Sequence, residues 1–350
     1  QRQDEAHRVH PAAGVAPVTM LDDAAFLGEL GLDGQLRPVR GVLPSVAAAA
    51  AAGFGQVMVP SANAPEAALV PGMRVIAAPS LSAALRWMRG DRSAMGPDAA
   101  EIFHGDRKPP TDSGAARVGD RRTAVDLADV LGQPLARRAA EICAAGGHHL
   151  MLLGPPGTGK TMLAERIPTI LPPLEPAAAL EVTSIHSIAG TLPPGSPLIS
   201  EPPFCGPHHT ATKAGIVGGG SGVIHPGAAS LAHMGILLLD EAPEYDRDVL
   251  DALRQPLESG QVVVARLGLT ARFPARFTLV LTANPCPCAR SGGPRGKCTC
   301  TPTARRRYLG RLSGPLLDRV DVKVEVLPVG RAELLSDGKS AEPSSVVAGR

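Results

Sequence analysis

The feature that most constrains the fold of this chain is the segment 150–161, which reads LMLLGPPGTGKT. Its apolar start predicts a buried β-strand, and the glycines that follow let the backbone turn its N–H groups toward an anion without an intervening Cβ. A helix beginning at Lys160 would add the positive end of its dipole at the same place. Strand, loop and helix at this spacing predict a site for the phosphates of a nucleoside triphosphate within an α/β fold.

The residues of this loop have separate expected roles. Lys160 would reach the terminal phosphates, and the Thr161 hydroxyl would bind a magnesium ion. The predicted nucleotide-binding residues are Gly154, Pro155, Pro156, Gly157, Thr158, Gly159, Lys160, Thr161 and Met162. A glycine-rich turn that binds nothing is the alternative, but the segment matches the phosphate-loop pattern at every defining position. ATP and Mg²⁺ are therefore the expected cofactors.

A second apolar run, at 235–241 (GILLLDE), ends in two carboxylates. It is long enough for a central strand of a parallel sheet, and such sheets bind ligands at the carboxyl ends of their strands. Asp240 would hold the magnesium through water, and Glu241 would orient or deprotonate the attacking water. Taken alone, the pair could be the solvated end of an ordinary strand, but its place downstream of the phosphate loop favours triphosphate hydrolysis.

Two further segments predict groups close to the terminal phosphate. The segment 277–284 (FTLVLTAN) is a buried-strand pattern ending in an amide, and in a sheet beside the previous strand it would bring Asn284 near the γ-phosphate. Arg319 follows a short apolar helix and could cross a subunit boundary to a neighbour's nucleotide, where an arginine neutralises charge in the transition state. A simple ion pair with Asp318 or Asp321 is the alternative for Arg319.

Four cysteines follow directly after this strand pattern: Cys286, Cys288, Cys298 and Cys300. Their order is CxC, nine other residues, CxC, and Gly292, Gly293 and Pro294 could fold one pair back on the other. Four thiolates can form a closed tetrahedral site, so zinc is the predicted ligand. Reduced thiols without metal are the first alternative and disulfides the second, because the chain indicates a cytoplasmic protein.

A series of longer strings carries a resemblance to a known family: GPPGTGKTML, EVTSIHSIAG, PHHT with a following GGG, PGAASLAHMGILLLDE, LRQPLESG, PARFTLVLTANPCPC and LSGPLLDRVD. Over residues 125–327 the chain is similar to the magnesium-chelatase-like AAA+ ATPases of the competence-associated ComM/YifB family. The resemblance implies a P-loop AAA+ core, with a parallel sheet flanked by helices. It also implies a hexameric, ATP-driven motor that acts on DNA by branch migration or helicase-like movement, in recombination and natural transformation.

Every charged side chain between Glu258 and Asp318 is arginine or lysine, and such a basic block favours an anionic partner. The resemblance implies that the cysteine-containing segment, and a hairpin built from 262–266 and 271–277, project toward the channel of the ring. The predicted contacts to DNA phosphates are Arg290, Arg295, Lys297, Arg305, Arg306 and Arg307. Aromatic residues are almost absent there apart from Tyr308, so stacking on bases is not predicted. A solvated, highly charged loop is the alternative.

The predicted organisation has five segments. Residues 1–24 form an irregular segment, 25–96 a partial Lon-protease-like (S5-like) α+β domain, 97–124 a linker, 125–328 the ATPase domain, and 329–350 a disordered tail. We interpret the chain as truncated at both ends, because it begins with Gln and nothing after Pro328 resembles the helical lid of AAA+ motors. Since the lid closes over the nucleotide, the chain by itself is expected to bind ATP weakly and hydrolyse it slowly.

Local patterns describe the N-terminal domain further. Asp33 and Gly34 predict a hairpin turn, residues 45–52 an alanine-rich helix, and residues 56–60 (QVMVP) a buried strand. The position of the Lon catalytic lysine would fall near Pro44, so the resemblance does not imply proteolysis.

Three functions stay open at the level of the sequence. The first is the DNA motor, and the second is the magnesium chelatase motor subunit, a related ATPase that drives metal insertion into a porphyrin. The third is a remnant that only binds nucleotide. The Lon-like segment and the four cysteines favour the first. No apolar stretch reaches the roughly 18 residues of a membrane-spanning helix, so a soluble, cytoplasmic protein is predicted.

Overall fold

The computed structural model describes residues 23–91, 102–103, 125–193, 195–220, 223–266, 269–288, 298–330 and 341–350. The chain divides into two compact units, one of Gln1–Val118 with His186–Leu198 and one of Gly119–Ile185 with Ile199–Arg350. The segment His186–Leu198 therefore belongs to the N-terminal unit, although the sequence predicted one continuous ATPase domain over 125–328. The hydroxyl of Ser187 donates to Glu66 Oε1 at 2.5 Å within that unit, a contact that local sequence patterns do not reveal.

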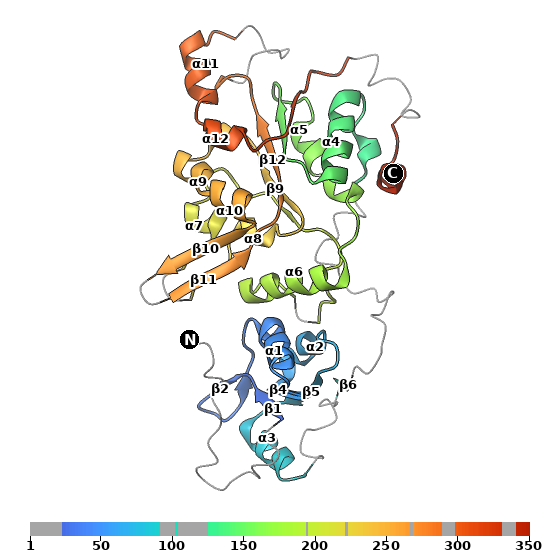
Figure 1. The fold of residues 1–350 in the computed structure, drawn as a ribbon, viewed down its shortest axis with the longest axis vertical. Helices are drawn as coiled ribbons and strands as arrows, with labels where there is room; N and C mark the ends of the chain where they lie inside the picture. Colours follow the sequence, from blue (N-terminus) through green and yellow to red (C-terminus); the bar gives the residue numbers. More distant parts are fainter. Residues whose placement is uncertain are drawn as a thin grey trace. The chain divides into compact units, whose positions relative to one another are not determined.

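The N-terminal unit is built around a small mixed sheet of order β1-β4-β5-β6 (Figure 1). β1, β4 and β5 are parallel to one another, and β6 is antiparallel to β5. Its strands are β1 (Ala24–Phe26), β4 (Gln56–Pro60), β5 (Arg74–Ala78) and β6 (Ile102–Phe103), and its helices are α1 (Val42–Ala51), α2 (Ala64–Ala67) and α3 (Leu81–Met88). Buried side chains such as Met58, Ile76 and Trp87 form its core.

The local predictions for this unit are confirmed with small shifts. The turn at Asp33 and Gly34 joins β2 (Glu29–Leu30) to the antiparallel β3 (Leu36–Arg37). The strand QVMVP is β4, and the alanine-rich helix begins at Val42, ahead of the predicted start at residue 45. Residues 1–22 and most of the predicted linker 97–124 lie outside the described residues; within that linker, β6 is a strand rather than a connection.

The second unit contains a five-stranded sheet of order β13-β7-β12-β9-β8 in which every neighbouring pair is parallel. The strands are β7 (Leu150–Leu153), β8 (Phe204–Cys205), β9 (Ile236–Leu239), β12 (Thr278–Ala283) and β13 (Val322–Glu325). β12 lies between β7 and β9, as the Leu279↔Leu237 and Leu281↔Met151 pairs show. Parallel strands end at the same edge of a sheet, so the segments after β7, β12 and β9 meet there.

Helices cover both faces of this sheet, which explains why its strands are apolar runs rather than alternating patterns (Figure 1). On one face, Leu150, Leu152 and Leu238 pack with α4 (Pro134–Gly146) and α5 (Lys160–Ala164). On the other face, Leu237 and Leu239 pack with helices that follow β8 and β9. Further helices are α6 (Pro176–Ala189), α7 (Lys213–Val217), α8 (Ala228–Leu231), α9 (Arg247–Ala252), α10 (Arg254–Ser259), α11 (Pro302–Leu309) and α12 (Gly314–Leu317). Among the described residues, no helix is long and apolar enough to cross a lipid bilayer.

The predicted hairpin is confirmed as β10 (Gln261–Arg266) and β11 (Leu269–Pro274), which pair antiparallel along their whole length. It leaves the body of the second unit as a two-stranded ribbon (Figure 1). Val262 and Phe273, which pair with each other near its base, are buried.

The prediction of a disordered tail over 329–350 is wrong for its last part. Residues Ser344–Gly349 form helix α14, and Val347 is buried in the core beside η5 (Ile167–Ile170). The Leu127 N–H donates to Ser344 Oγ at 2.7 Å, a bond between residues 217 positions apart. The polar composition of the segment gave no sign of a partner so distant in sequence. Residues 331–340 lie outside the described part of the chain.

Candidate nucleotide site

The phosphate loop follows β7 as predicted. Two of its glycines are required by their backbone conformation and a third by close packing. Gly157 and Gly159 have φ of 79° and 85°, in the left-handed region that favours glycine. A Cβ at Gly154 would lie 2.1 Å from the carbonyl oxygen of Val326, so a side chain would push the segment that follows β13 away from the loop. α5 begins at Lys160, as the sequence predicts, and ends at Ala164.

The other predicted loop residues divide into supporting and exposed positions. The hydroxyl of Thr158 donates to the Pro155 carbonyl at 2.9 Å and stabilises the turn, whereas Pro156 is exposed. Met162 is half-buried on α5, and its carbonyl accepts a hydrogen bond from Arg166 at 2.8 Å. Gln133, which the sequence analysis missed, donates from Nε2 to the Thr158 carbonyl at 3.4 Å.

Lys160 is buried inside the loop with all its hydrogen-bonding capacity engaged. Its Nζ donates to the carbonyl oxygens of Gly154 at 2.7 Å and Pro155 at 2.8 Å, and to Asn284 Oδ1 at 3.3 Å. Burial lowers the pKa of the ammonium, and the nearby carboxylates of Asp240 and Glu241 oppose that change. The ammonium group therefore lies between the loop and the acidic residues at the end of β9. Phosphate oxygens could replace its present acceptors, which are the two loop carbonyls and the Asn284 amide oxygen, because a charged acceptor makes a stronger hydrogen bond.

Asp240 and Thr161 meet across the sheet edge. Thr161 Oγ1 lies 3.0 Å from Asp240 Oδ1 and 3.1 Å from Oδ2. A hydroxyl beside a carboxylate is a set of hard oxygen donors of the kind that Mg²⁺ binds, usually together with water and substrate phosphates. The residues predicted to hold magnesium are thus adjacent, and their chemistry fits that ion.

Thr282 is a site residue that the sequence analysis missed. It is fully buried in β12. Its hydroxyl donates to Asp240 Oδ1 at 2.5 Å, and the Thr282 Oγ1 atom also accepts a hydrogen bond from the Glu241 N–H at 2.9 Å. Thr282 therefore orients both acidic residues at once. The signal in the sequence was a hydroxyl near the carboxyl end of a mostly apolar strand, and only the pairing of β12 with β9 gives it this role.

Glu241 and Asn284 complete the constellation. Glu241 has φ 52° and ψ 47°, a left-handed conformation that non-glycine residues seldom adopt and that often marks functional sites. Asn284 Nδ2 lies 3.4 Å from Glu241 Oε1, while Asn284 Oδ1 accepts from Lys160. The buried amide thus lies between the cation of the phosphate loop and the carboxylate after β9.

Arg319 is separate from these residues. Its Nη2 lies 2.5 Å from Glu258 Oε1, so it forms an ion pair, but with neither Asp318 nor Asp321 as the sequence suggested. Asp321 instead accepts the His149 N–H at 2.9 Å. Nearly half of the Arg319 side chain is exposed, so the residue faces solvent in this chain.

The side chains of the four cysteines after β12 lie close together. Of the six predicted DNA-contact residues, three lie within the described part of the chain. The Sγ atoms of Cys286, Cys288, Cys298 and Cys300 all lie within 4.8 Å of one another. Among the described residues no cysteine forms a disulfide. Arg305, Arg306 and Arg307 are exposed on α11, whereas Arg290, Arg295 and Lys297 lie outside the described residues.

A parallel sheet with a phosphate loop after β7, an acidic pair after β9 and a polar side chain after the intervening β12 defines a P-loop nucleotide-binding fold of the AAA+ class. Residues 126–334 match the family described as magnesium chelatase, subunit ChlI, and residues 11–63 match one described as subunit ChlI of Mg-chelatase. The chain belongs to the magnesium chelatase subunit ChlI family, since the first match covers more than half of it.

Individual relatives confirm the resemblance to the ComM/YifB group. A protein of Mycobacterium tuberculosis described as uncharacterized is 51% identical over 310 residues, which are 89% of this chain and 58% of the relative. Competence protein ComM of Haemophilus influenzae is 40% identical over 322 residues, 92% of this chain and 60% of the relative. The magnesium-chelatase 38 kDa subunit of Rhodobacter capsulatus is 27% identical over 191 residues, 51% of this chain and 48% of the relative. The chain spans less than two thirds of the length of these relatives.

Proposed function

We propose that this chain binds ATP with Mg²⁺ and hydrolyses it as part of an AAA+ motor. One cluster of side chains at the carboxyl edge of the sheet supports the proposal. In it Thr161 contacts Asp240, and Asn284 lies between Lys160 and Glu241. The residues fit the cofactor: one buried cation for phosphate, hard oxygens for magnesium and a carboxylate for water. A remnant that only binds nucleotide would not need the strained, amide-held Glu241.

Each side chain has a distinct part in the proposed hydrolysis. Lys160 neutralises charge on the terminal phosphates, and Thr161 and Asp240 hold the magnesium ion, which withdraws charge from those phosphates. Glu241 orients the attacking water and accepts its proton, and Asn284 holds the carboxylate toward it. Thr282 keeps Asp240 and Glu241 in register through its two hydrogen bonds.

We further propose that the chain assembles with copies of itself in a hexamer, in which Arg319 acts on a neighbour's nucleotide. Its guanidinium is nearly half exposed and pairs with Glu258 rather than with a residue of the chain's own site, which supports this role. The ion pair with Glu258 would hold the side chain extended until a neighbour's phosphates compete for it.

Arg319→Ala is therefore expected to lower the ATPase rate on the order of a thousandfold at assembling concentrations, because transition-state charge loses its partner. Steady-state phosphate release measures this, with Glu258→Gln as the control that breaks the same ion pair but keeps the arginine. Equal rates for wild type and Arg319→Ala, or an equal loss in both variants, would contradict the proposal.

DNA is the proposed substrate of the motor. The exposed arginines of α11, the all-basic run between Glu258 and Asp318 and the similarity to a competence protein support it. The greater identity to ComM than to the chelatase subunit makes porphyrin metallation the weaker candidate. The cytoplasmic location and the slow turnover of the chain by itself stay predictions.

The paired substitution Arg306→Ala and Arg307→Ala is expected to weaken binding to branched DNA uniformly across sequences. It should also reduce the slope of log affinity against log salt by about 2, because each lost phosphate contact removes about one released counterion. Fluorescence anisotropy over a salt series measures both effects. Arg247→Ala, which removes an exposed arginine of α9, is the matched control. Affinity insensitive to salt would contradict phosphate contact.

A further inference from the structure

The four cysteines after β12 enclose a common point. Cys286 Sγ lies 3.3 Å from Cys288 Sγ and 3.4 Å from Cys298 Sγ, and Cys288 Sγ lies 3.5 Å from Cys298 Sγ. A disulfide needs about 2.05 Å between sulfurs, so these contacts are not covalent bonds. Four sulfurs held tetrahedrally at about 2.3 Å from one zinc ion would lie about 3.8 Å apart, close to the spacing observed.

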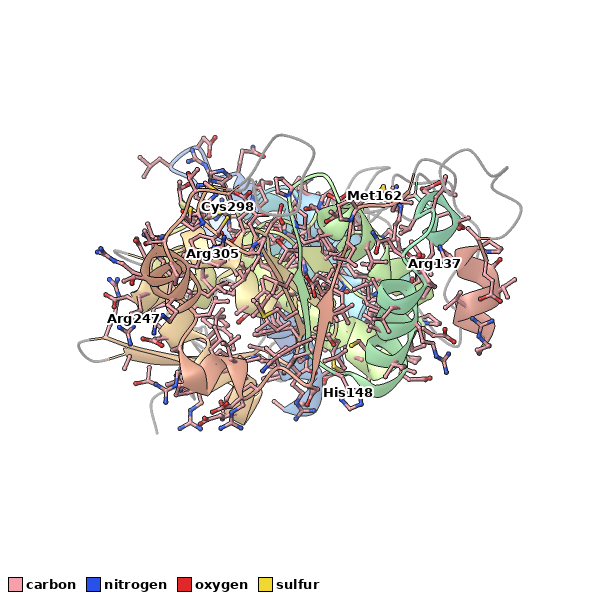
Figure 2. The ribbon with its side chains drawn as sticks, turned by 90° about the horizontal axis from the view of Figure 1, so that it is seen from above. Arg137, His148, Met162, Arg247, Cys298 and Arg305 are labelled. Atoms are coloured by element: carbon pink, nitrogen blue, oxygen red, sulfur yellow. The ribbon has the colours of Figure 1, made fainter. Side chains whose placement is uncertain are left out.

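Hydrogen-bond donors lie beside the sulfurs of the cluster. The Cys300 N–H lies 3.4 Å from Cys298 Sγ, and Arg305 also donates to that sulfur (Figure 2). N–H donors that orient and stabilise metal-binding groups are the usual second layer of a metal site. Arg305, predicted as a DNA contact, thus has a role in the cluster.

The cluster connects two elements of the nucleotide site. Cys286 is fully buried and stands two positions after Asn284, at the end of β12. Cys300 stands directly before Thr301, whose hydroxyl accepts the Ala304 N–H at 3.2 Å and caps α11. Tyr308 on α11 is buried and lies next to the end of β12, where its hydroxyl oxygen accepts a hydrogen bond from the backbone N–H of Asn284.

We propose that Cys286, Cys288, Cys298 and Cys300 bind one Zn²⁺ ion, and that this ion fixes α11 against β12 and so sets the position of Asn284. Cys286 stands two positions after Asn284 and Cys300 directly before the cap of α11, so an ion bound to both would join the strand end to the helix in addition to the Tyr308 hydrogen bond. The zinc site stands on the cysteine geometry alone. Its effect on hydrolysis rests on the proposed ATPase function.

The experiment has a readout that does not depend on activity. Protein purified without chelator should contain one zinc per chain, and Co²⁺ exchanged into it should give the visible absorption of a tetrahedral tetrathiolate. Cys300→Ser should lose both signals, whereas Cys205→Ala, which changes a cysteine of β8 outside the cluster, should keep them. Iron or no metal in the wild type, or full zinc in Cys300→Ser, would overturn the proposal.

The positioning role is tested on the same samples. Zinc removal should leave ATP affinity nearly unchanged, lower the hydrolysis rate on the order of tenfold to a hundredfold through misplacement of Asn284, and speed amide hydrogen exchange at the end of β12 and in α11. Returned zinc should restore all of these. Faster exchange with unchanged hydrolysis in an active enzyme would overturn the positioning role. Zinc-dependent exchange in a chain with no ATPase at all would instead count against the proposed function.

Discussion

Lys160→Ala is expected to abolish measurable ATP hydrolysis and to weaken ATP binding by about tenfold to a hundredfold, the loss of one charge-assisted contact to phosphate. The reason lies in the position of the ammonium, which is buried within the loop and directed at the strand edge by three hydrogen bonds. Titration with a fluorescent ATP analogue and a phosphate-release assay measure the two effects.

The control for this variant is Lys213→Ala, which removes an exposed lysine of α7 outside the site. Thermal unfolding of both variants shows whether the fold survives, because Lys160 also bonds the loop carbonyls. A folded Lys160→Ala protein that binds and hydrolyses ATP like the wild type would contradict the assignment of this loop.

Glu241→Gln should separate binding from chemistry. The amide has nearly the same size as the carboxylate and still accepts the Asn284 hydrogen bond, but it cannot take a proton from water. We therefore expect unchanged ATP affinity and a hydrolysis rate lowered on the order of a hundredfold or more. Single-turnover hydrolysis with bound ATP measures the chemical step directly.

The matched control is Glu244→Gln, an exposed carboxylate three positions further along the same segment. It should hydrolyse ATP at the wild-type rate. Hydrolysis by Glu241→Gln within about twofold of the wild type, a change too small for the loss of a general base, would remove Glu241 from the proposed chemistry.

The three central strands of the sheet and most of the site could be predicted because the information is local. Strands buried on both faces of a parallel sheet read as short apolar runs, and 150–153, 236–239 and 278–283 are such runs. Each is followed at once by the side chains that the chemistry needs. The edge where they meet then follows from parallel pairing alone.

What could not be predicted depends on partners distant in sequence. Thr282 orients the acidic pair only because β12 lies beside β9, and Arg319 pairs with Glu258, which is 61 positions away. Helix α14 lies in a segment of small and polar residues, and its order comes from Leu127 and the core rather than from its own pattern. Composition indicates how a segment behaves in isolation, and these contacts override it.

The most direct test of the account is a crystal structure of this chain with a non-hydrolysable ATP analogue and Mg²⁺. We predict that the phosphates lie against the backbone N–H groups of the 154–161 loop, with Lys160 Nζ on the terminal phosphates and the metal ion beside Thr161 and Asp240. Nucleotide bound elsewhere, or a metal ion that contacts neither Thr161 nor the water shell of Asp240, would contradict it.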